Sequence, residues 1–359
     1  MKNALLKLTK TLLINILIFL TLIFFIEIFF GYWFDQDNLG SYMREHRMKK
    51  TLYELKSDEK IYKYIYKRNY YGFRGEEINL NEIRAILVGG STADERYKPE
   101  EFTIVGFLNK KFEEKGSKLK IINAGIEGQS TMGHISNFKH WFPKLKNFSP
   151  DYIIFYIGIN DALKNIENKN NIETDDGWLL NPNIFDSIKD NIKSRSLILD
   201  SIRKIKHKYY KGNEKKRIIY DFDYMIKNKS SDFEYQNFDE KLKYYDLEKI
   251  LDENKKRIKY YLANVDKLFK YSKKIGAKPV FINQEAGRKD ITEKLFALNV
   301  SLINHCKKNS YNCINLAKKL NGNPKYWWDG IHTTATGSKN ISEIIFSQLE
   351  SIIRWILKY

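Results

Sequence analysis

Cysteine is nearly absent from this chain, which has only Cys306 and Cys313 among its 359 residues. This scarcity excludes a scaffold held together by several disulfides. The two residues are close enough in sequence for one disulfide, but sequence alone does not decide whether they pair. His305 lies beside Cys306, yet no Cys/His spacing of the metal-ligand type occurs. We therefore expect no metal site.

Signatures of nucleic-acid binding are also missing. The net charge is +18, but Lys and Arg are interspersed with Asp and Glu along the whole chain. No homeodomain, zinc-finger or RNA-recognition pattern accompanies the charge. We expect a solvated basic surface and no nucleic-acid partner. Attraction to an anionic membrane surface or to an acidic glycan stays open.

One long apolar run lies near the N-terminus. Leu12–Ile26 is almost continuously apolar, and after Glu27 the run resumes as far as residue 34. Its length suits one membrane-spanning helix of about 20 residues, with Tyr32 and Trp33 as interfacial anchors. A cleavable signal peptide is the alternative, but no small-x-small cleavage site follows the run. The sequence predicts an uncleaved anchor over residues 1–34.

Flanking charges bear on the orientation of this anchor. Basic residues lie on both sides of the run, so the overall count is nearly balanced. Nearest the run, Lys10 precedes it and Asp35 and Asp37 follow it. This predicts a single pass through the cytoplasmic membrane with the N-terminus inside and the globular part extracytoplasmic.

Short apolar runs alternate with amphipathic stretches from residue 83 onward. This alternation predicts parallel βαβ crossovers and a three-layer α/β sheet, with the active site at the carboxyl ends of the strands. Residues 35–82 are predicted to be a juxtamembrane stalk, and 83–359 the domain. Expected strands are 83–88, 119–122, 152–157, 279–283 and 312–316. Expected helices are 102–114, 133–144, 247–275, 291–308 and 335–355.

Residues 163–245 interrupt this rhythm, being rich in Lys, Asn, Asp and Tyr. We interpret them as a partly helical insertion near the mouth of the site. A substrate lid and a surface elaboration are both compatible with the sequence.

Four short motifs carry the chemistry: Gly89–Thr92, Asn123–Gly128, Gly158–Asp161 and Asp329–His332. The first three directly follow predicted strands, and the fourth precedes the last predicted helix. Each motif alone can be explained without a catalytic role, as a capped turn, a glycine loop or a surface pair. Their order and their placement after strands favour one shared site.

The residue types in these motifs suit nucleophilic catalysis. A serine hydroxyl needs a base that a third group orients. We expect Ser91 to be the nucleophile, His332 the base and Asp329 the orienting carboxylate. A helix beginning at Ser91 would favour developing negative charge. The backbone N–H groups of Ser91 and Gly128 and the side-chain amide of Asn160 are the expected oxyanion donors.

This order of motifs resembles the SGNH hydrolases, also called the GDSL esterase/lipase superfamily, over residues 83–162 and about 247–353. The resemblance assigns Ser91, Gly128 and Asn160 to its first three blocks, and Asp329 with His332 to its last. It implies a flavodoxin-like α/β/α sandwich that hydrolyses or transfers acyl groups through a Ser ester without a cofactor. Gly90 replaces the family's Asp before the nucleophile, as in envelope-associated branches, which puts the plain GDSL label in doubt.

The anchor and the predicted external domain resemble family members that add or remove acetyl groups on cell-surface glycans. We therefore predict a carbohydrate O-acyl esterase or transferase. A phospholipase or thioesterase, and a non-catalytic envelope-binding module, are the alternatives. Trp327 and Trp328, just before Asp329, would either form an aromatic wall for a sugar or pack in the core.

Overall fold

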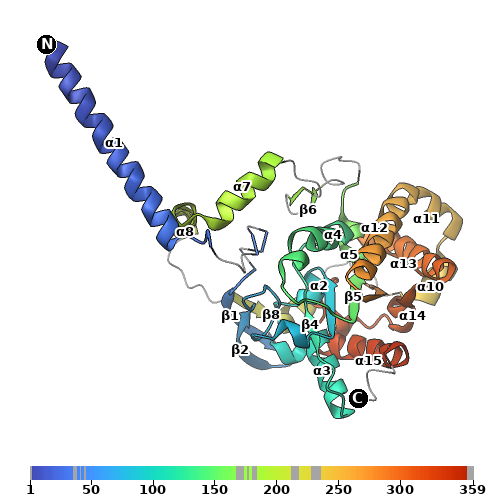
Figure 1. The fold of residues 1–359 in the computed structure, drawn as a ribbon. Coiled ribbons are helices and arrows are strands. Elements are labelled where there is room, and N and C mark those ends of the chain that lie inside the picture. The colour runs from blue at the N-terminus through green and yellow to red at the C-terminus, as the bar shows by residue number, and fades with distance from the viewer. Residues whose placement is uncertain are drawn as a thin grey trace. The chain divides into compact units, whose positions relative to one another are not determined.

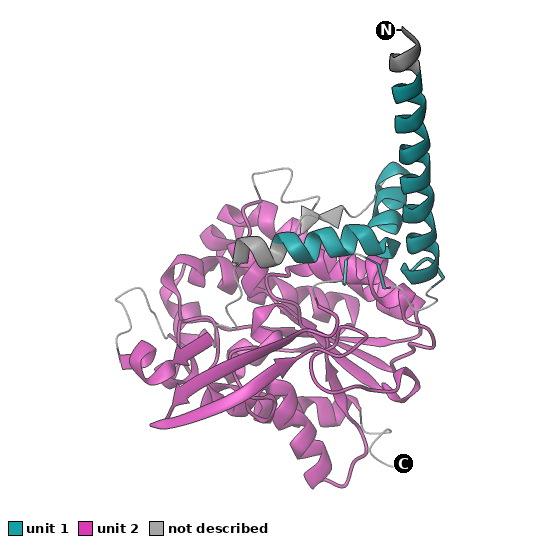
Figure 2. Cartoon of the chain, turned by 90° about the vertical axis from the view of Figure 1, so that its left-hand side faces the viewer, with its two compact units in different colours: residues 1–45, 181–215 teal, residues 46–180, 216–359 magenta. Residues whose placement is uncertain are grey.

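A computed structural model describes residues 2–34, 39–40, 42–43, 46–166, 174–175, 178–179, 184–211, 218–227 and 236–353 (Figure 1). The chain forms two compact units (Figure 2). Unit 1 comprises residues 1–45 and 181–215, and unit 2 comprises residues 46–180 and 216–359. The predicted site residues all belong to unit 2.

A five-stranded parallel sheet forms the centre of unit 2, in the order β10-β9-β5-β3-β4. Every residue of β3 and β5 is buried, as expected for strands covered on both faces. The predicted α/β fold with a parallel sheet is confirmed, and the predicted strands match within a few residues. The strands are β3 (Ala85–Gly89), β4 (Ile121–Asn123), β5 (Tyr152–Ile157), β9 (Lys278–Asn283) and β10 (Asn312–Ile314).

Helices pack on both faces of this sheet. On one face, side chains of α3 (Ile104–Glu114) and α15 (Ala335–Ile352) share a core with Leu87 and Ile154. On the other face, Phe138 of α4 (Thr131–His140) packs against Phe155 and against Tyr271 of α12 (Lys255–Lys274).

The remaining helices of unit 2 are shorter connections, apart from α13. The helix predicted over 247–275 is divided at Asn254, which caps α11 and starts α12. These elements are α2 (Ser91–Asp94), α5 (Ile159–Leu163), α9 (Phe222–Lys227), α10 (Phe238–Tyr244), α11 (Leu247–Glu253), α13 (Lys289–Asn309) and α14 (Leu316–Lys319), with 3₁₀ turns at Leu80–Glu82, Glu100–Phe102, Phe142–Lys144 and Pro324–Tyr326.

A second, three-stranded sheet combines two strands from the region predicted as a stalk with one strand from the 163–245 segment. β1 (Lys50–Ser57) and β2 (Lys60–Lys67) form an antiparallel hairpin, and β8 (Ile218–Asp221) pairs with β1 in parallel. Unit 2 starts at His46 and includes this hairpin, which buries residues such as Leu55 and Tyr66. The 163–245 segment supplies β8 and also a two-stranded β6–β7 pair (Thr174–Asp175, Trp178–Leu179).

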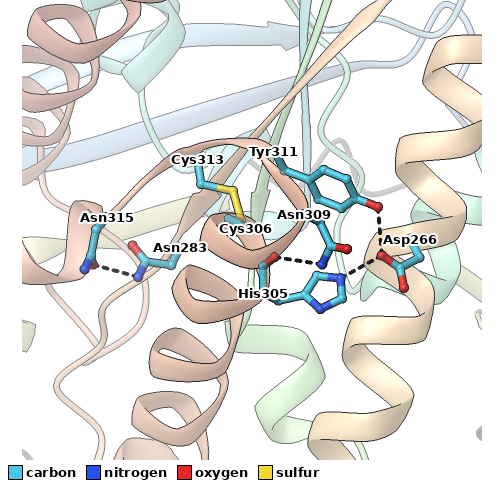
Figure 3. The surroundings of a disulfide bond; sticks show 8 residues. All are labelled: Asp266, Asn283, His305, Cys306, Asn309, Tyr311, Cys313 and Asn315. Carbon is cyan, nitrogen blue, oxygen red and sulfur yellow. Dashed lines mark hydrogen bonds and ion pairs between the residues drawn. A yellow bond between two sulfur atoms is a disulfide. The ribbon is translucent and has the colours of Figure 1, made fainter.

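The two cysteines form a disulfide between the end of α13 and β10 (Figure 3). The Nε2 atom of His305 lies 2.7 Å from Asp266 Oδ1, which also accepts a hydrogen bond from Tyr311. No group of three metal-ligating side chains occurs among the residues that the structure describes.

All regular elements that the structure describes in unit 1 are helices. Its helices are α1 (Lys2–Phe30), α7 (Ile184–Arg195) and α8 (Leu197–Lys211). Lys7–Phe30 has a mean hydropathy of 2.8 and none of that window is buried. By length and composition α1 is a candidate membrane span, although a signal sequence passes the same test.

Candidate active site

Ser91 lies at the carboxyl end of β3, the central strand among the three that carry motifs. It is the first residue of α2, a helix of only four residues, and α3 begins later at Ile104. The helix predicted over 102–114 corresponds to α3, and the helix that begins at Ser91 is a single short turn. Electrostatic support for a developing negative charge must come from individual N–H donors and not from a long helix dipole.

Ser91, His332 and Asp329 form a continuous hydrogen-bonded relay. The Oγ atom of Ser91 lies 2.8 Å from Nε2 of His332. On the other side of the ring, Nδ1 lies 2.6 Å from Oδ2 of Asp329. The second oxygen, Oδ1, accepts hydrogen bonds from the backbone N–H groups of Ile331 and His332, at 3.0 and 2.7 Å. The relay therefore has both the distances and the order that serine activation requires.

The Asp329 carboxylate is kept ionised by its surroundings. Burial on its own raises the pKa of this group, but the hydrogen bond and the charge of His332 and the two backbone donors outweigh burial, so that the pKa falls below its ordinary value. In a neutral imidazole, a proton on Nδ1 would bond to Asp329 and leave Nε2 as the acceptor that faces Ser91 Oγ.

The predicted oxyanion donors come from three adjacent strand ends. β3 lies between β4 and β5, so the loops carrying Ser91, Gly128 and Asn160 meet at one edge of the sheet. Gly128 has a φ of 80°, a left-handed conformation that favours glycine. The Asn160 amide donates one hydrogen bond to Gln129 O at 2.7 Å, which fixes its orientation. An amide NH₂ has two donors, so this bond leaves one for a ligand.

Gly90 has a direct steric reason to lack a side chain. A Cβ atom built there would lie 2.0 Å from Nδ2 of Asn160 and 3.0 Å from Gln129 O. The Asp found before the nucleophile in the resembled family pattern would thus displace Asn160 in this chain. The lack of a side chain at Gly90 therefore leaves room for Asn160 in its present position.

Gln284, which the sequence analysis did not single out, connects two of the motif loops. Its Oε1 accepts a hydrogen bond from Ile159 N at 2.8 Å, and its Nε2 donates to Thr92 Oγ1 at 2.7 Å. Its own carbonyl accepts from the Asn299 amide. Gln284 follows β9, so its position at a strand end was the available signal.

A buried ion pair joins the nucleophile turn to the histidine loop. Lys98 Nζ lies 2.6 Å from Glu95 Oε1, and it also donates to the carbonyl and hydroxyl of Thr333. Glu95 caps α2 in a left-handed conformation, and its Oε1 accepts hydrogen bonds from the hydroxyls of Thr333 and Ser338. Thr333 directly follows His332. No sequence pattern indicated that these residues meet.

The hairpin region supplies a second buried contact to the nucleophile turn. Arg68, just after β2, donates from Nη1 to Asp94 Oδ1 and to Gly125 O, both at 2.9 Å. Tyr66 donates to the same carboxylate at 2.9 Å. Since Asp94 ends α2, the residues expected to be a stalk help to fix the loop that carries Ser91.

Aromatic rings pack around His332. Tyr97 lies 5.1 Å from the imidazole between ring centroids, and Trp328 stacks on it at 5.5 Å. Tyr220 of β8 contacts Tyr97 in turn. Trp327 and Trp328 are only 1% and 7% exposed, so both indoles are core residues and neither forms the open wall for a sugar. Trp328 instead orients the imidazole ring from one side.

The model of the GDSL-like lipase/acylhydrolase family matches residues 86–345, which is more than half of the chain. No curated protein sequence matches.

Similar solved structures include a psychrotrophic esterase, EstA, from Pseudoalteromonas sp., at 13% identity and a TM-score of 0.42, covering 76% of this chain and 99% of that one. An acetylxylan esterase, Axe2, from Geobacillus stearothermophilus has 10% identity and a TM-score of 0.41, covering 75% and 94%. A GDSL-like lipase from Bacteroides thetaiotaomicron has 14% identity and a TM-score of 0.38, covering 78% and 91%. Similarities of this size do not bear on the substrate. On the family match, the chain belongs to the GDSL-like lipase/acylhydrolase family.

Proposed function

We propose that this chain is a serine esterase in which Ser91 is the nucleophile, His332 the general base and Asp329 the orienting carboxylate. The single observation that carries the proposal is the relay from Ser91 Oγ to His332 Nε2 and from His332 Nδ1 to Asp329 Oδ2, at 2.8 and 2.6 Å. Membership of an acylhydrolase family supports the reaction class, and the relay supports the role proposed for each residue.

The first half-reaction transfers the acyl group to the enzyme. Ser91 Oγ attacks the ester carbonyl carbon as His332 Nε2 takes the hydroxyl proton. The carbonyl oxygen becomes an oxyanion, which accepts hydrogen bonds from the N–H groups of Ser91 and Gly128 and from the Asn160 amide. When the C–O bond to the alcohol breaks, His332 returns the proton to the leaving oxygen. The product is an acyl-Ser91 ester and a free alcohol.

The second half-reaction releases the acyl group. A water molecule loses its proton to His332 and attacks the acyl-Ser91 carbonyl, which gives a carboxylic acid and regenerates the Ser91 hydroxyl. A sugar hydroxyl attacking in the same way gives an O-acylated acceptor instead. The same residues serve both outcomes, so esterase and transferase differ in which acceptor reaches the acyl enzyme.

The acyl group is proposed to be small, such as acetyl, and carried by a carbohydrate. Polar and charged groups flank the oxyanion donors: Glu127 precedes Gly128 and pairs with Arg96, and Lys164 lies one turn after Asn160. A polyhydroxylated substrate can form hydrogen bonds with such groups, whereas a long acyl chain needs an apolar channel. This polar rim supports a glycan ester over a lipid ester.

The catalytic unit is proposed to lie outside the cytoplasmic membrane, held there by α1 as a single-pass anchor with the N-terminus inside. The length and apolar composition of Lys7–Phe30 support the anchor. The Cys306–Cys313 disulfide supports the compartment, because disulfides persist in oxidising environments outside the cytosol.

A fluorophosphonate probe tests the nucleophile directly. The full chain, purified in detergent, should become labelled, and Ser91→Ala should remove the label while keeping the thermal unfolding profile. Ser130→Ala is the matched control, because Ser130 caps α4 beside the site but is not in the relay. Unlabelled folded wild-type protein, or labelling that persists in Ser91→Ala, would contradict the proposal and favour a non-catalytic binding module.

The substrate class needs a separate measurement. Acetate release from O-acetylated polysaccharides is compared with hydrolysis of p-nitrophenyl esters of increasing acyl length. We expect acetyl esters to react fastest, with activity falling as the chain lengthens. Faster reaction with long acyl esters would replace the glycan proposal by a lipase or thioesterase activity. Adding an unacetylated glycan distinguishes transfer from hydrolysis, because transfer yields acetylated glycan in place of acetate.

A further inference from the structure

Glu27 is a charged residue within the apolar α1, and unit 1 shows what it binds. Its two carboxylate oxygens accept hydrogen bonds from the Ser196 hydroxyl at 2.6 Å and from the N–H groups of Leu197 and Ile198 at 3.1 and 3.0 Å. Trp33 Nε1 donates to the same carboxylate at 3.1 Å. Glu27 thus satisfies the free N–H groups at the start of α8. These hydrogen bonds hold the N-terminus of α8 against Glu27, about one turn before the end of α1.

A second set of contacts fixes the corner between α7 and α8 to the same end of α1. Tyr32 N donates to Arg195 O at 2.8 Å, and the Arg195 guanidinium bonds the Trp33 carbonyl. Within unit 1, α7 runs crosswise to α1 in the view of Figure 1, and α8 does so in the view of Figure 2. If α1 crosses a bilayer, this corner therefore lies at the depth where the apolar run ends, which is the headgroup region.

Both helices expose apolar stripes. On α7 the apolar residues recur at positions 184, 185, 188 and 192, which is one face of a helix. Ile184 and Phe185 are 76% and 81% exposed, and Ile205 of α8 is 68% exposed. On α8, Ile198, Ile202 and Ile205 recur at helical spacing. Helices of this length do not expose so many large apolar side chains to water without a partner surface.

The charges of α7 and α8 point to an anionic partner. The α7 sequence contains three basic residues and two acidic ones, and the α8 sequence contains five basic residues and one acidic one. The basic residues are Lys189, Lys193, Arg195, Arg203, Lys204, Lys206, Lys208 and Lys211, and the acidic ones are Asp186, Asp190 and Asp200. An apolar face with a basic flank is the composition of helices that lie in the interface of an anionic bilayer.

We propose that α7 and α8 form an interfacial platform that lies in the headgroup region of the same bilayer that α1 crosses, with anionic lipid as the partner. This inference rests on the anchor role proposed for α1, and it assigns a function to part of the 163–245 segment. Residues 184–211 then bind lipid and are neither a substrate lid nor a surface elaboration without a partner.

Depth-dependent fluorescence quenching in nanodiscs tests the platform. The full chain is reconstituted in phosphatidylcholine with phosphatidylglycerol, and a single NBD label is placed at Ile188→Cys or Ile202→Cys on the apolar stripes. Ser187→Cys, about 100° around α7 from Ile188 and outside the apolar stripe, is the matched control, and Leu17→Cys reports on α1. A nitroxide at the lipid headgroup should quench positions 188 and 202 at least roughly twofold more than position 187. A nitroxide in the acyl chains should quench position 17.

The outcomes separate the platform from the proposals on which it rests. In one outcome, acyl-chain nitroxides quench the label at position 17, but headgroup nitroxides quench positions 188 and 202 no more than position 187. This result overturns the platform and leaves the anchor proposal intact. Position 17 unquenched as well overturns both. If headgroup nitroxides quench positions 188 and 202 equally in nanodiscs with and without phosphatidylglycerol, anionic lipid is not the partner. Shielding of positions 188 and 202 that depends on protein concentration in detergent would identify a second copy as the partner instead. Fluorophosphonate labelling of each variant reports separately on Ser91.

Discussion

Lys98 and Glu95 form a salt bridge at 2.6 Å in which each side chain is only 2% exposed. The ammonium also bonds the Thr333 carbonyl and hydroxyl, and the carboxylate accepts from Ile104 N at the start of α3. One buried pair thereby joins three segments: the end of the nucleophile turn, the start of α3 and the loop that carries His332. The Ser91 to His332 distance depends on all three.

Lys98→Met should destabilise the protein strongly. Removing one partner leaves the other charge buried without compensation, which costs about 3–5 kcal/mol in the free energy of unfolding. Chemical denaturation of wild type and variant measures this cost. Lys111→Met is the matched control, because Lys111 pairs with Glu343 at 3.6 Å on the surface and such pairs contribute about 0–1 kcal/mol. Equal effects of the two substitutions would show that the buried pair has no special role.

Gly90→Ala should lower turnover without unfolding the domain. The new Cβ would lie 2.0 Å from Asn160 Nδ2 and would move the amide away from the oxyanion position. Loss of one such donor costs about 10²–10³-fold in kcat. Steady-state kinetics on an acetyl ester measure the effect, and circular dichroism checks the fold.

A double-mutant cycle identifies the cause of this loss. If Gly90→Ala acts by displacing Asn160, adding it to Asn160→Ala should cost little more than Asn160→Ala alone. Additive losses would show that Gly90 affects catalysis by another route, such as the backbone of Ser91.

The central sheet was predictable because its signal is local. Each run from Ile83–Val88 to 312–316 is mostly apolar and bounded by polar or glycine residues, and buried parallel strands have this composition. The four motifs follow the strand ends, so their meeting at one edge follows from the topology. The relay geometry between Ser91 and His332, 241 residues apart, agrees with that expectation.

The hairpin and its partners were not predictable in the same way. Lys60–Lys67 contains three Lys among its Ile and Tyr residues, which weakens the apolar signal of a strand. The same sheet also includes β8, which pairs with β1 from about 160 residues further along the chain. Sequence alone gives no register for such a pairing. Arg68 and Lys98 act through contacts between distant segments, so no local pattern marks them, and Gln284 has only its place after β9 as a local signal.

Gln284→Met tests whether the link between two motif loops affects catalysis. Methionine keeps the side-chain length but leaves Ile159 N without its acceptor, and each buried polar group left unpaired costs about 1–3 kcal/mol. We expect kcat to fall by roughly tenfold with little change in KM, because the loops hold oxyanion donors and not the remote parts of a substrate. Thr92→Val removes the other hydrogen bond, to Thr92 Oγ1. Strictly additive effects of the two substitutions, or a change confined to KM, would contradict a positioning role.

His46 gives the protein a defined sensitivity to mild acid. Burial, together with the charges of Arg68 and Lys49, lowers the pKa of His46 from 6.5 to about 3. The unfolded chain therefore binds a proton below pH 6.5 that the folded protein does not, so the stability present above that pH is lost as the pH falls toward 3. The slope is at most about 1.4 kcal/mol per pH unit for one proton. Denaturation of wild type and His46→Gln between pH 7 and pH 5, where the carboxylates stay largely ionised, should show a shallower decline in the variant. Parallel declines would mean that His46 takes up its proton equally in both states.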